Sequence, residues 1–277
     1  MTRVDLHLHT TASDGRCSPH ELVERAAQAA LTVIAVTDHD TTAAVSDVHR
    51  LAAERGMEAV TGIEITAIED GRDVHILGYF FDPLNEALGT WLAAQRAARI
   101  ARVEAIGARL EALGMPVDVR PLVSQAAREP RRSLGRPQVA RLMIEAGYVA
   151  DSREAFDRWL SLGCPAFVPR AGPAPETVID AIHDAGGIAS LAHPGKRGLE
   201  ARVAPLAAHG LDAVEAFHPD HDGLLVDRYV GLARELKLLI TGGSDFHGDP
   251  AHGLEPGSVT LPPGEWARLQ KVRHARR

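Results

Sequence analysis

The chain of 277 residues is predicted to fold as one large α/β barrel that carries a helical insertion. The first observation is an alternation of short β-rich runs with amphipathic, Ala-rich stretches, which is typical of βα units around a parallel sheet. The second is a break in this alternation between residues 85 and 169, where long helical patterns occur with almost no strand signal. A segment of that length is too long to be a loop.

Seven short apolar runs, several of them rich in β-branched residues, are expected to form the strands of the barrel. They are Val4–His9, Val33–Asp38, Ala59–Thr66, Asp73–Phe81, Gly187–His193, Ala213–Phe217 and Leu238–Ser244.

The helices are predicted from apolar periodicity and from capping residues. Pro19–Ala30 follows Ser18, which is placed to form a capping box with Glu21, and Thr41–Arg55 is ended by Gly56. The later helical patterns are Glu86–Leu113, Pro137–Ala146, Arg153–Leu162, Pro175–Ala185, Leu225–Lys237 and Glu265–Val272. Residues 1–84 and 170–277 are therefore assigned to the barrel, and residues 85–169 to an insertion that is expected to cover the barrel mouth as a lid.

Composition excludes several classes of function. A net charge of −7, with 30 basic and 37 acidic residues, argues against duplex nucleic acid as a partner. This net charge does not exclude a local basic pocket. Two cysteines, Cys17 and Cys164, supply neither a disulfide framework nor a thiolate zinc site, which fits a reducing compartment. No run approaches the length of a membrane span and no leader pattern precedes the first strand, so a cytoplasmic location is expected.

The first candidate metal ligands follow the first two predicted strands. His7 and His9 are two residues apart in a strand and therefore point to one face, although two polar strand residues would show the same spacing. Asp14 lies in the polar segment TTASDG, which also reads as an Asp-Gly turn. His39 lies in the segment TDHD, directly after the apolar run VIAV, where ionisable residues are costly unless they are paired or bind a cation. Asp40 has the alternative role of capping the following helix.

The remaining candidates occupy the other strands. Glu64 lies within the apolar run VTGIEIT, His75 within DVHILGY, and His193 at the end of GIASLAHPG. Asp245 and His247 follow the last predicted strand, again two residues apart. Each residue alone has a structural interpretation. Together they place an imidazole or carboxylate on nearly every strand at one rim, which predicts a multinuclear metal site.

The segments HLHT, SDG, TDHD, GIE, VHILGY, AHPG and GSDFHG resemble the signature of the PHP (polymerase and histidinol phosphatase) family, and the resemblance covers essentially the whole chain. It implies a distorted, TIM-like (β/α)7 barrel and three divalent metal ions at the C-terminal rim. Manganese is the metal that the resemblance favours, while nitrogen and oxygen ligands without thiolate also suit zinc or iron.

The resemblance also implies how the nine residues share the ions. The first ion is held by His7, His9, Glu64 and Asp245. The second is held by Glu64 as the bridge, with His75 and His193. The third is held by Asp14, His39 and His247. All nine positions are retained, which argues against the relatives that are metal-free structural modules.

Clustered divalent ions generate hydroxide from bound water and neutralise charge on a phosphoryl group, so hydrolysis of a phosphate ester is expected. The metal-bridging hydroxide would be held via Glu64. His218, at the end of the run VEAFHP, is a candidate to protonate the leaving alkoxide or to contact the phosphate, with a structural strand-end histidine as the alternative.

Four basic residues are candidates for binding substrate phosphate, because arginine and lysine are the side chains that hold phosphate. They are Arg170, Lys196, Arg197 and Arg136. Similar sequences often read GRPH where this chain has Gly135-Arg136-Pro137-Gln138, so Gln138 puts one substrate contact in doubt.

The expected activity, from the resemblance to small nucleotide phosphatases, is release of the 3′-phosphate from a 3′,5′-bisphosphonucleotide to leave the nucleoside 5′-monophosphate. Alternatives are hydrolysis of AMP or of a cyclic phosphate, 5′–3′ trimming of short RNA from its 5′ end, and histidinol phosphatase activity. A non-catalytic, polymerase-associated metal module is a further alternative, which the acidic charge balance and the lack of a nucleic-acid-binding motif disfavour. No G-x-G-x-x-G follows a strand, so a dinucleotide-dependent oxidoreductase is not expected.

Overall fold

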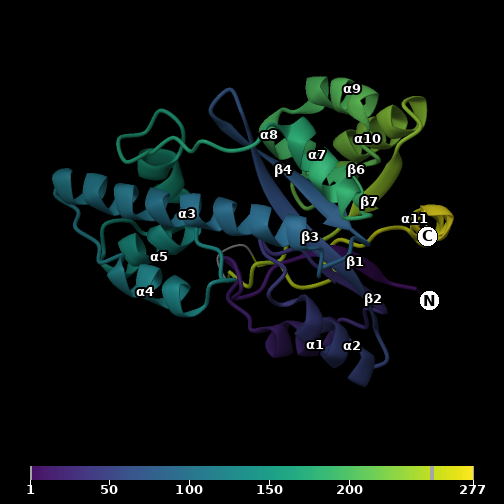
Figure 1. The fold of residues 1–277 in the computed structure, drawn as a ribbon, viewed down its shortest axis with the longest axis horizontal. Coiled ribbons are helices and arrows are strands. Elements are labelled where there is room, and N and C mark those ends of the chain that lie inside the picture. The colour runs from purple at the N-terminus through teal and green to yellow at the C-terminus, as the bar shows by residue number, and fades with distance from the viewer. Residues whose placement is uncertain (1, 250–252, 277) are drawn as a thin grey trace.

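The computed structural model describes residues 2–249 and 253–276, without the side chains of Lys196, Arg197 and residues 274–276. A seven-stranded sheet lies at the centre, with helices on its outside (Figure 1). The strands are β1 (Val4–Leu8), β2 (Val33–Val36), β3 (Glu58–Glu69), β4 (Arg72–Tyr79), β5 (Ile188–Leu191), β6 (Ala213–Phe217) and β7 (Leu239–Gly242).

The sheet follows the chain order from β1 to β7 and curls into a nearly closed, TIM-like barrel. Its two ends meet where Leu8 forms a parallel bridge with Phe246 and the amide N–H of His9 donates to the carbonyl of Phe246 at 2.9 Å. All seven strands lie where the sequence predicts them, with ends that differ by a few residues. The expected α/β barrel is confirmed.

Strand β4 runs antiparallel to both of its neighbours, so the expectation of an all-parallel sheet is wrong at this strand. The reason is the short link from β3 to β4, where Asp70 and Gly71 both have positive φ, 49° and 74°, as a tight hairpin turn requires. No helix crosses over between these strands. Because β4 is reversed, His75 in its first half pairs with Thr66 and lies at the rim where the parallel strands end.

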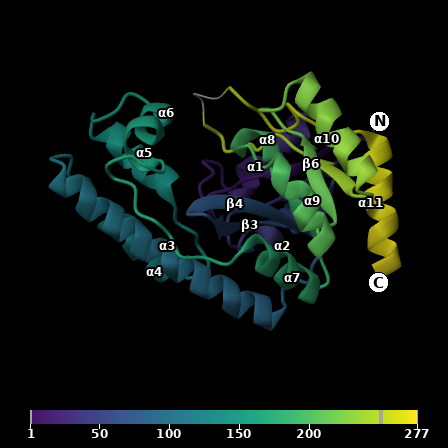
Figure 2. The ribbon, with the colours of Figure 1, turned by 90° about the horizontal axis from the view of Figure 1, so that it is seen from above.

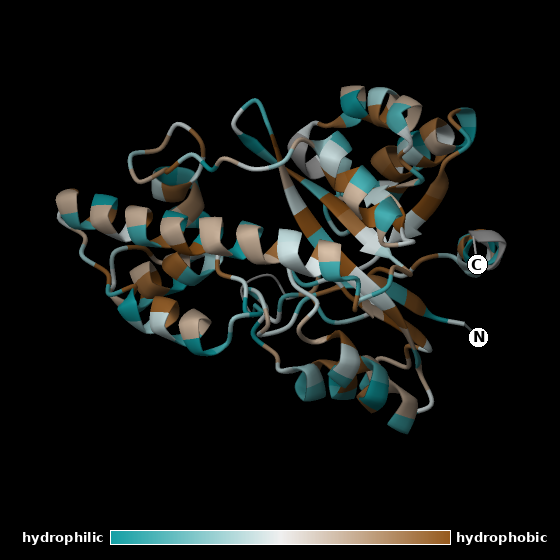
Figure 3. Cartoon of the chain, in the orientation of Figure 1, coloured by the Kyte–Doolittle hydropathy of each residue, from teal (hydrophilic) through white to brown (hydrophobic). Residues whose placement is uncertain are grey.

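Seven helices in the described chain surround the barrel: α1 (Pro19–Gln28), α2 (Val45–Glu54), α7 (Pro175–Asp184), α8 (Pro194–Arg197), α9 (Glu200–His209), α10 (Gly223–Glu235) and α11 (Pro263–Arg276). Ser18 forms the predicted capping box with Glu21. Hydrophobic residues concentrate in the strands, and α1 and α2 show many hydrophilic residues (Figure 3). No described helix is long and apolar enough to pass through a membrane.

The segment between β4 and α7 is helical. It contains α3 (Glu86–Ala112), α4 (Arg120–Arg128), α5 (Arg136–Glu145), α6 (Ser152–Ala155) and a π-helical turn, η1 (Phe156–Leu160). Helix α3 runs from the barrel out to the other helices of this segment, which lie on the side opposite the two chain termini (Figures 1 and 2). These helices share a separate hydrophobic cluster, which includes Val103, Ile106, Leu110, Val139 and Met143.

Several local expectations differ from the structure. The predicted helix Arg153–Leu162 is split into α6 and the π turn, and α4, α8 and α9 were not expected. Helix α2 begins at Val45 instead of Thr41, and its N-cap is Ala44 and not Asp40. Asp40 adopts a left-handed backbone conformation, with φ of 51°, and its side chain accepts a hydrogen bond from the amide of Thr66 on β3.

Candidate metal centre

The structure brings all nine predicted ligands together at the rim of the barrel. Each comes from a strand or from the loop after it. Six of them are buried to 93% or more: His7, His9, Asp14, Glu64, His75 and His193. Their nitrogen and oxygen atoms form four overlapping groups that are compact enough to hold a cation: His9, Asp14, His39 and His247; His7, His193 and Asp245; His7, His9 and Glu64; and His39, Glu64 and His75.

We call His7, His9, Glu64 and Asp245 the first group, after the ion that the resemblance assigns to them. The Nε2 atoms of His7 and His9 lie 3.4 and 3.3 Å from Oε2 of Glu64. The same two nitrogens lie 3.3 and 3.4 Å from Oδ1 of Asp245. Both ring nitrogens therefore lie close to both carboxylates, and a cation bound among these side chains would offset the negative charge of the two carboxylates.

The other oxygen of Glu64 serves a second group. Its Oε1 lies 2.6 Å from Nδ1 of His75 and 3.1 Å from Nε2 of His193. The two carboxylate oxygens of Glu64 thus face different histidines, as a carboxylate that bridges two ions must.

A third group surrounds Asp14. Its Oδ2 lies 3.5 Å from Nε2 of His39, and its Oδ1 lies 3.4 Å from Nε2 of His247. His9 stands between this group and the first, since its Nδ1 lies 3.7 Å from Oδ1 of Asp14. That Nδ1 atom is buried and has no hydrogen-bond partner among the described residues. A buried ring nitrogen without a partner is costly, and a nearby cation would remove part of that cost.

The charges of the centre also fit cations. Burial alone would raise the pKa of Glu64, but His39, His75 and His7 hold it well below its usual value. Burial would lower the pKa of His9, but Asp245 and Glu64 raise it to about 10. The carboxylate of Glu64 is therefore ionised, and the negative charge around the histidine rings favours their protonated form. Bound divalent ions would supply that charge instead of protons.

Glu215 on β6 belongs to the centre and was missed by the sequence reasoning. It is fully buried, its Oε1 lies 2.9 Å from Nδ1 of His7, and its Oε2 accepts the amide N–H of His193 at 2.8 Å. A carboxylate behind a ligand histidine fixes which ring nitrogen carries the proton. The signal that could have found it is the one used for Glu64, a carboxylate inside an apolar strand.

His218 lies beside the first group. Its Nε2 is 3.2 Å from Oδ2 of Asp245, and its Nδ1 accepts the amide N–H of Asp220 at 3.0 Å. Because Nδ1 is an acceptor, the neutral ring carries its proton on Nε2. His218 is thus placed to donate a hydrogen bond at the edge of the centre.

A cleft of about 750 Å³ opens over the centre. Seven of the nine predicted ligands line it: Asp14, His39, Glu64, His75, His193, Asp245 and His247. Other lining residues come from the β3–β4 hairpin and the helical insertion, and apart from the carboxylate of Asp73 many of them are cationic or apolar. These include Arg72, Arg136, Arg141, Arg153, Phe156, Leu162 and Phe167.

The four predicted phosphate-binding residues differ in their placement. Arg136 lines the cleft, where its guanidinium bonds Asp73 at 2.6 Å and lies over the ring of Phe156. Arg170 is buried next to the ion pair of Arg99 with Asp40, and it is absent from the described lining. The side chains of Lys196 and Arg197 lie outside the described residues.

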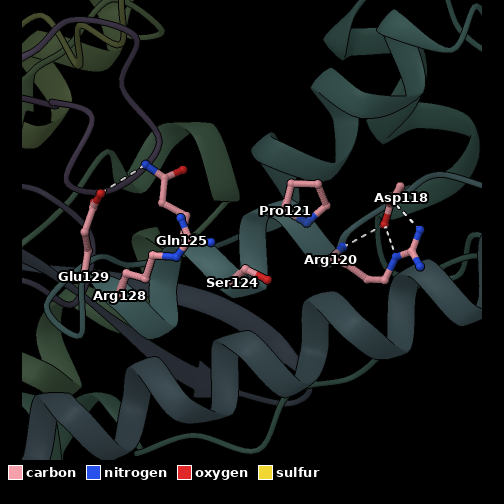
Figure 4. A pocket seen from close by; sticks show the side chains of 7 residues that line it. All are labelled: Asp118, Arg120, Pro121, Ser124, Gln125, Arg128 and Glu129. Carbon is pink, nitrogen blue, oxygen red and sulfur yellow. Dashed lines mark hydrogen bonds and ion pairs between the residues drawn. The ribbon is translucent and has the colours of Figure 1, made fainter.

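A second hollow lies on the insertion, around α4 (Figure 4). There Arg120 donates two hydrogen bonds of 2.8 Å to the carboxylate of Asp118, and Gln125 donates to Glu129. Its described lining shares no residue with the cleft, and we assign it no role.

Comparison with known proteins extends these observations. The PHP domain model matches residues 5–130. A 5′–3′ exoribonuclease of Haemophilus influenzae is 35% identical over 88% of this chain and 90% of its own length. A 3′,5′-nucleoside bisphosphate phosphatase of Chromobacterium violaceum is 31% identical over 95% of this chain and 94% of its own. The structure of a candidate metal-dependent phosphoesterase from Bifidobacterium adolescentis has a TM-score of 0.87 at 31% identity, covering 98% of this chain and 96% of that one.

Proposed function

The chain belongs to the PHP domain family of metal-dependent phosphoesterases, and on this premise we propose that it releases the 3′-phosphate of a 3′,5′-bisphosphonucleotide. The product would be the nucleoside 5′-monophosphate. The reaction centre comprises the nine metal ligands, with three divalent ions shared among them and manganese as the expected metal. When bound, such ions supply hydroxide at neutral pH and offset the charge that builds on the phosphoryl group.

The protein's own side chains orient this chemistry. Glu215 accepts the Nδ1 proton of His7, which leaves the Nε2 lone pair of His7 directed at the space between Glu64 and Asp245. Glu64 divides its two oxygens between the first and second groups. His218 is placed to donate the Nε2 proton to an oxygen of the substrate at the edge of the centre. The same N–H lies within hydrogen-bond distance of Oδ2 of Asp245.

The choice of substrate rests on a surplus of arginine beside the cleft, where Arg170 is buried and Arg99, Arg102 and Arg136 are half-buried. Arg99 and Arg170 lie 2.5 and 3.2 Å from one carboxylate oxygen of Asp40. Arg136 and Arg102 lie 2.6 and 3.8 Å from the carboxylate of Asp73. Two carboxylates thus face four guanidinium groups.

This surplus is not fully satisfied inside the protein. Nε of Arg170 and Nη2 of Arg102 are buried without a hydrogen-bond partner among the described residues. Burial and the nearby guanidinium of Arg136 lower the pKa of Arg102 to about 10, which shows that positive charge is crowded here. An anion in the cleft against Arg136 would relieve that crowding. A second, non-reacting phosphate of the substrate has the required charge, and its binding energy would align the reacting phosphate.

The test is phosphate release from 3′,5′-bisphosphoadenosine by manganese-reconstituted protein, with the products separated from both monophosphates and from adenosine. We expect conversion to 5′-AMP that stops there. Asp245→Asn, which removes a carboxylate of the first group, is the inactive control. Absence of turnover by protein that has bound metal would overturn this choice of substrate, and AMP, a cyclic phosphate and histidinol phosphate would then be compared.

A second candidate function is 5′–3′ trimming of short RNA. It is favoured by the exoribonuclease relative and by the rings of Phe156 and Phe167 in the cleft wall, since aromatic rings stack bases without sequence preference. A short 5′-phosphorylated RNA distinguishes the two functions. Stepwise release of 5′-mononucleotides would support trimming, whereas an unchanged RNA would leave the bisphosphate as the preferred substrate.

A further inference from the structure

The loop that carries the metal ligand Asp14 is held by the helical insertion through three of its backbone carbonyls. The amide of Ser133 donates to the carbonyl of Ala12 at 2.9 Å. The side-chain amide of Gln138 donates to the carbonyl of Ser13 at 2.6 Å, and the guanidinium of Arg141 donates to the carbonyl of Asp14 itself. Three consecutive carbonyls of one loop therefore depend on a segment more than 100 residues away in the sequence.

Gln138 uses both ends of its side chain for this arrangement. While its Nε2 donates to Ser13, its Oε1 accepts the amide N–H of Gly135 at 2.8 Å, directly before α5. The residue is only 4% exposed and is not among the described residues that line the cleft. The sequence puts a substrate contact at this position in doubt, and Gln138 is placed away from the described lining of the cleft. Its contacts are those of a residue that fixes a loop.

The barrel holds the same loop from the other side. Asp38, after β2, accepts the amide of Thr10 at 2.8 Å and the hydroxyls of Thr10 and Ser13 at 2.6 Å each. Gly15 packs so closely that an added Cβ would lie 2.6 Å from the backbone of His9. Asp38 thus fixes the start of the loop, and the insertion fixes the carbonyls that lead to Asp14.

We infer that Gln138, assisted by Arg141, is a positioning residue for the ion at Asp14, His39 and His247, so that the helical insertion completes this metal site. The inference rests on the three-ion centre of the proposed function. Asp14 needs such support because it lies on a loop, whereas His7 and Glu64 lie on strands whose backbones are fixed by the sheet. Partners behind a metal ligand typically change metal affinity about 10- to 100-fold.

The test uses the full-length protein, stripped of metal with a chelator and titrated with Mn²⁺ by calorimetry. Gln138→Met removes both hydrogen bonds at similar volume. Gln138→His is the rescue variant, because a ring N–H can donate to the same Ser13 carbonyl. Val139→Ala is the matched control, since it loosens the packing of the same helix without touching the loop.

We expect the wild-type protein, Gln138→His and Val139→Ala to bind three ions. In Gln138→Met the third ion should bind about 10- to 100-fold more weakly, while the other two keep their affinity. Arg141→Met, which removes the hydrogen bond to the Asp14 carbonyl, should show the same selective loss of affinity. It replaces Gln138→Met in the test if that variant does not fold.

Equal affinities for all three ions in both loop variants and the wild type would overturn the inference while leaving the proposed function intact. A uniform loss at all three sites would also overturn it, because Gln138 would then act on the fold as a whole. A wild-type protein that binds fewer than three ions would contradict the three-ion centre, and this inference with it.

Discussion

Oε1 of Glu215 lies 2.9 Å from Nδ1 of His7, at the back of the metal centre. Both residues are fully buried, so this contact decides which nitrogen of His7 is free to bind an ion. The second oxygen of Glu215 accepts a hydrogen bond from the amide N–H of His193, which is itself a predicted metal ligand. Glu215 therefore contacts two of the predicted ligands.

Replacing this carboxylate should therefore weaken metal binding while the fold persists. For Glu215→Gln we expect an affinity for Mn²⁺ about 10- to 100-fold lower, measured by calorimetry on chelated protein. Glu176→Gln, which alters an ion pair with Arg202 near the surface, is the control. Unchanged affinity in Glu215→Gln would show that His7 does not need this partner.

Asp40 is expected to contribute strongly to stability. Burial would raise the pKa of its carboxyl, but Arg99 and Arg170 hold it below its ordinary value of 3.8. Asp40→Asn leaves the buried guanidinium of Arg170 and the half-buried guanidinium of Arg99 without their counter-charge, which typically costs about 3 kcal/mol of unfolding free energy. Urea denaturation near pH 7 measures this loss.

The pH dependence of the same variant gives a further check. Because the folded pKa of Asp40 is depressed, its contribution is complete above the unfolded value of 3.8 and disappears as the pH falls through the folded value. The difference between wild type and Asp40→Asn should therefore shrink below about pH 4. Asp118→Asn, at an exposed ion pair with Arg120, should show no measurable loss at either pH.

Metal binding should release protons. In the metal-free protein the pKa of His9 is raised to about 10 by Asp245 and Glu64, against the lowering effect of burial, and that of His7 is raised well above its usual value by Glu215 and Asp245. An ion must displace these protons, so affinity should rise steadily from about pH 6 to about pH 9. Calorimetry in buffers of different ionisation enthalpy counts the protons, and pH-independent affinity would be the opposite result.

Arg136 should distinguish substrates with one phosphate from those with two. Arg136→Met removes the guanidinium from the cleft wall, and loss of one charged hydrogen bond corresponds to about a 10- to 100-fold decrease in kcat/KM for 3′,5′-bisphosphoadenosine. Turnover of a simple phosphate monoester should change little. Arg158→Met, on the exposed side of the π turn and paired with Glu154, is the matched control.

Much of the candidate centre was predictable because its ligands sit at strand ends in apolar surroundings. The spacing of His7 and His9 and the buried position of Glu64 are local signals that burial in a barrel explains. The direction of β4 was predictable only from the Asp70-Gly71 turn, because apolar runs look alike in parallel and antiparallel strands.

The phosphate-binding residues were harder to predict, because a long side chain can reach in many directions. Arg170 turns to Asp40, which is 130 residues away in the sequence, and nothing local to either residue indicates that contact. The position of Gln138 behind the Asp14 loop likewise depends on how the insertion packs on the barrel. Such contacts between distant segments follow from the tertiary structure and not from a sequence pattern.

We propose that the nine rim residues bind the ions that hydrolyse a nucleotide phosphate. The most direct test of this proposal is a titration of chelated protein with Mn²⁺ in which bound metal and release of phosphate from 3′,5′-bisphosphoadenosine are measured on the same samples. We expect no turnover before metal is added, and a rate that rises with bound metal until three ions per chain are present. Undiminished turnover by metal-free protein would show that the rim residues do not act through bound metal.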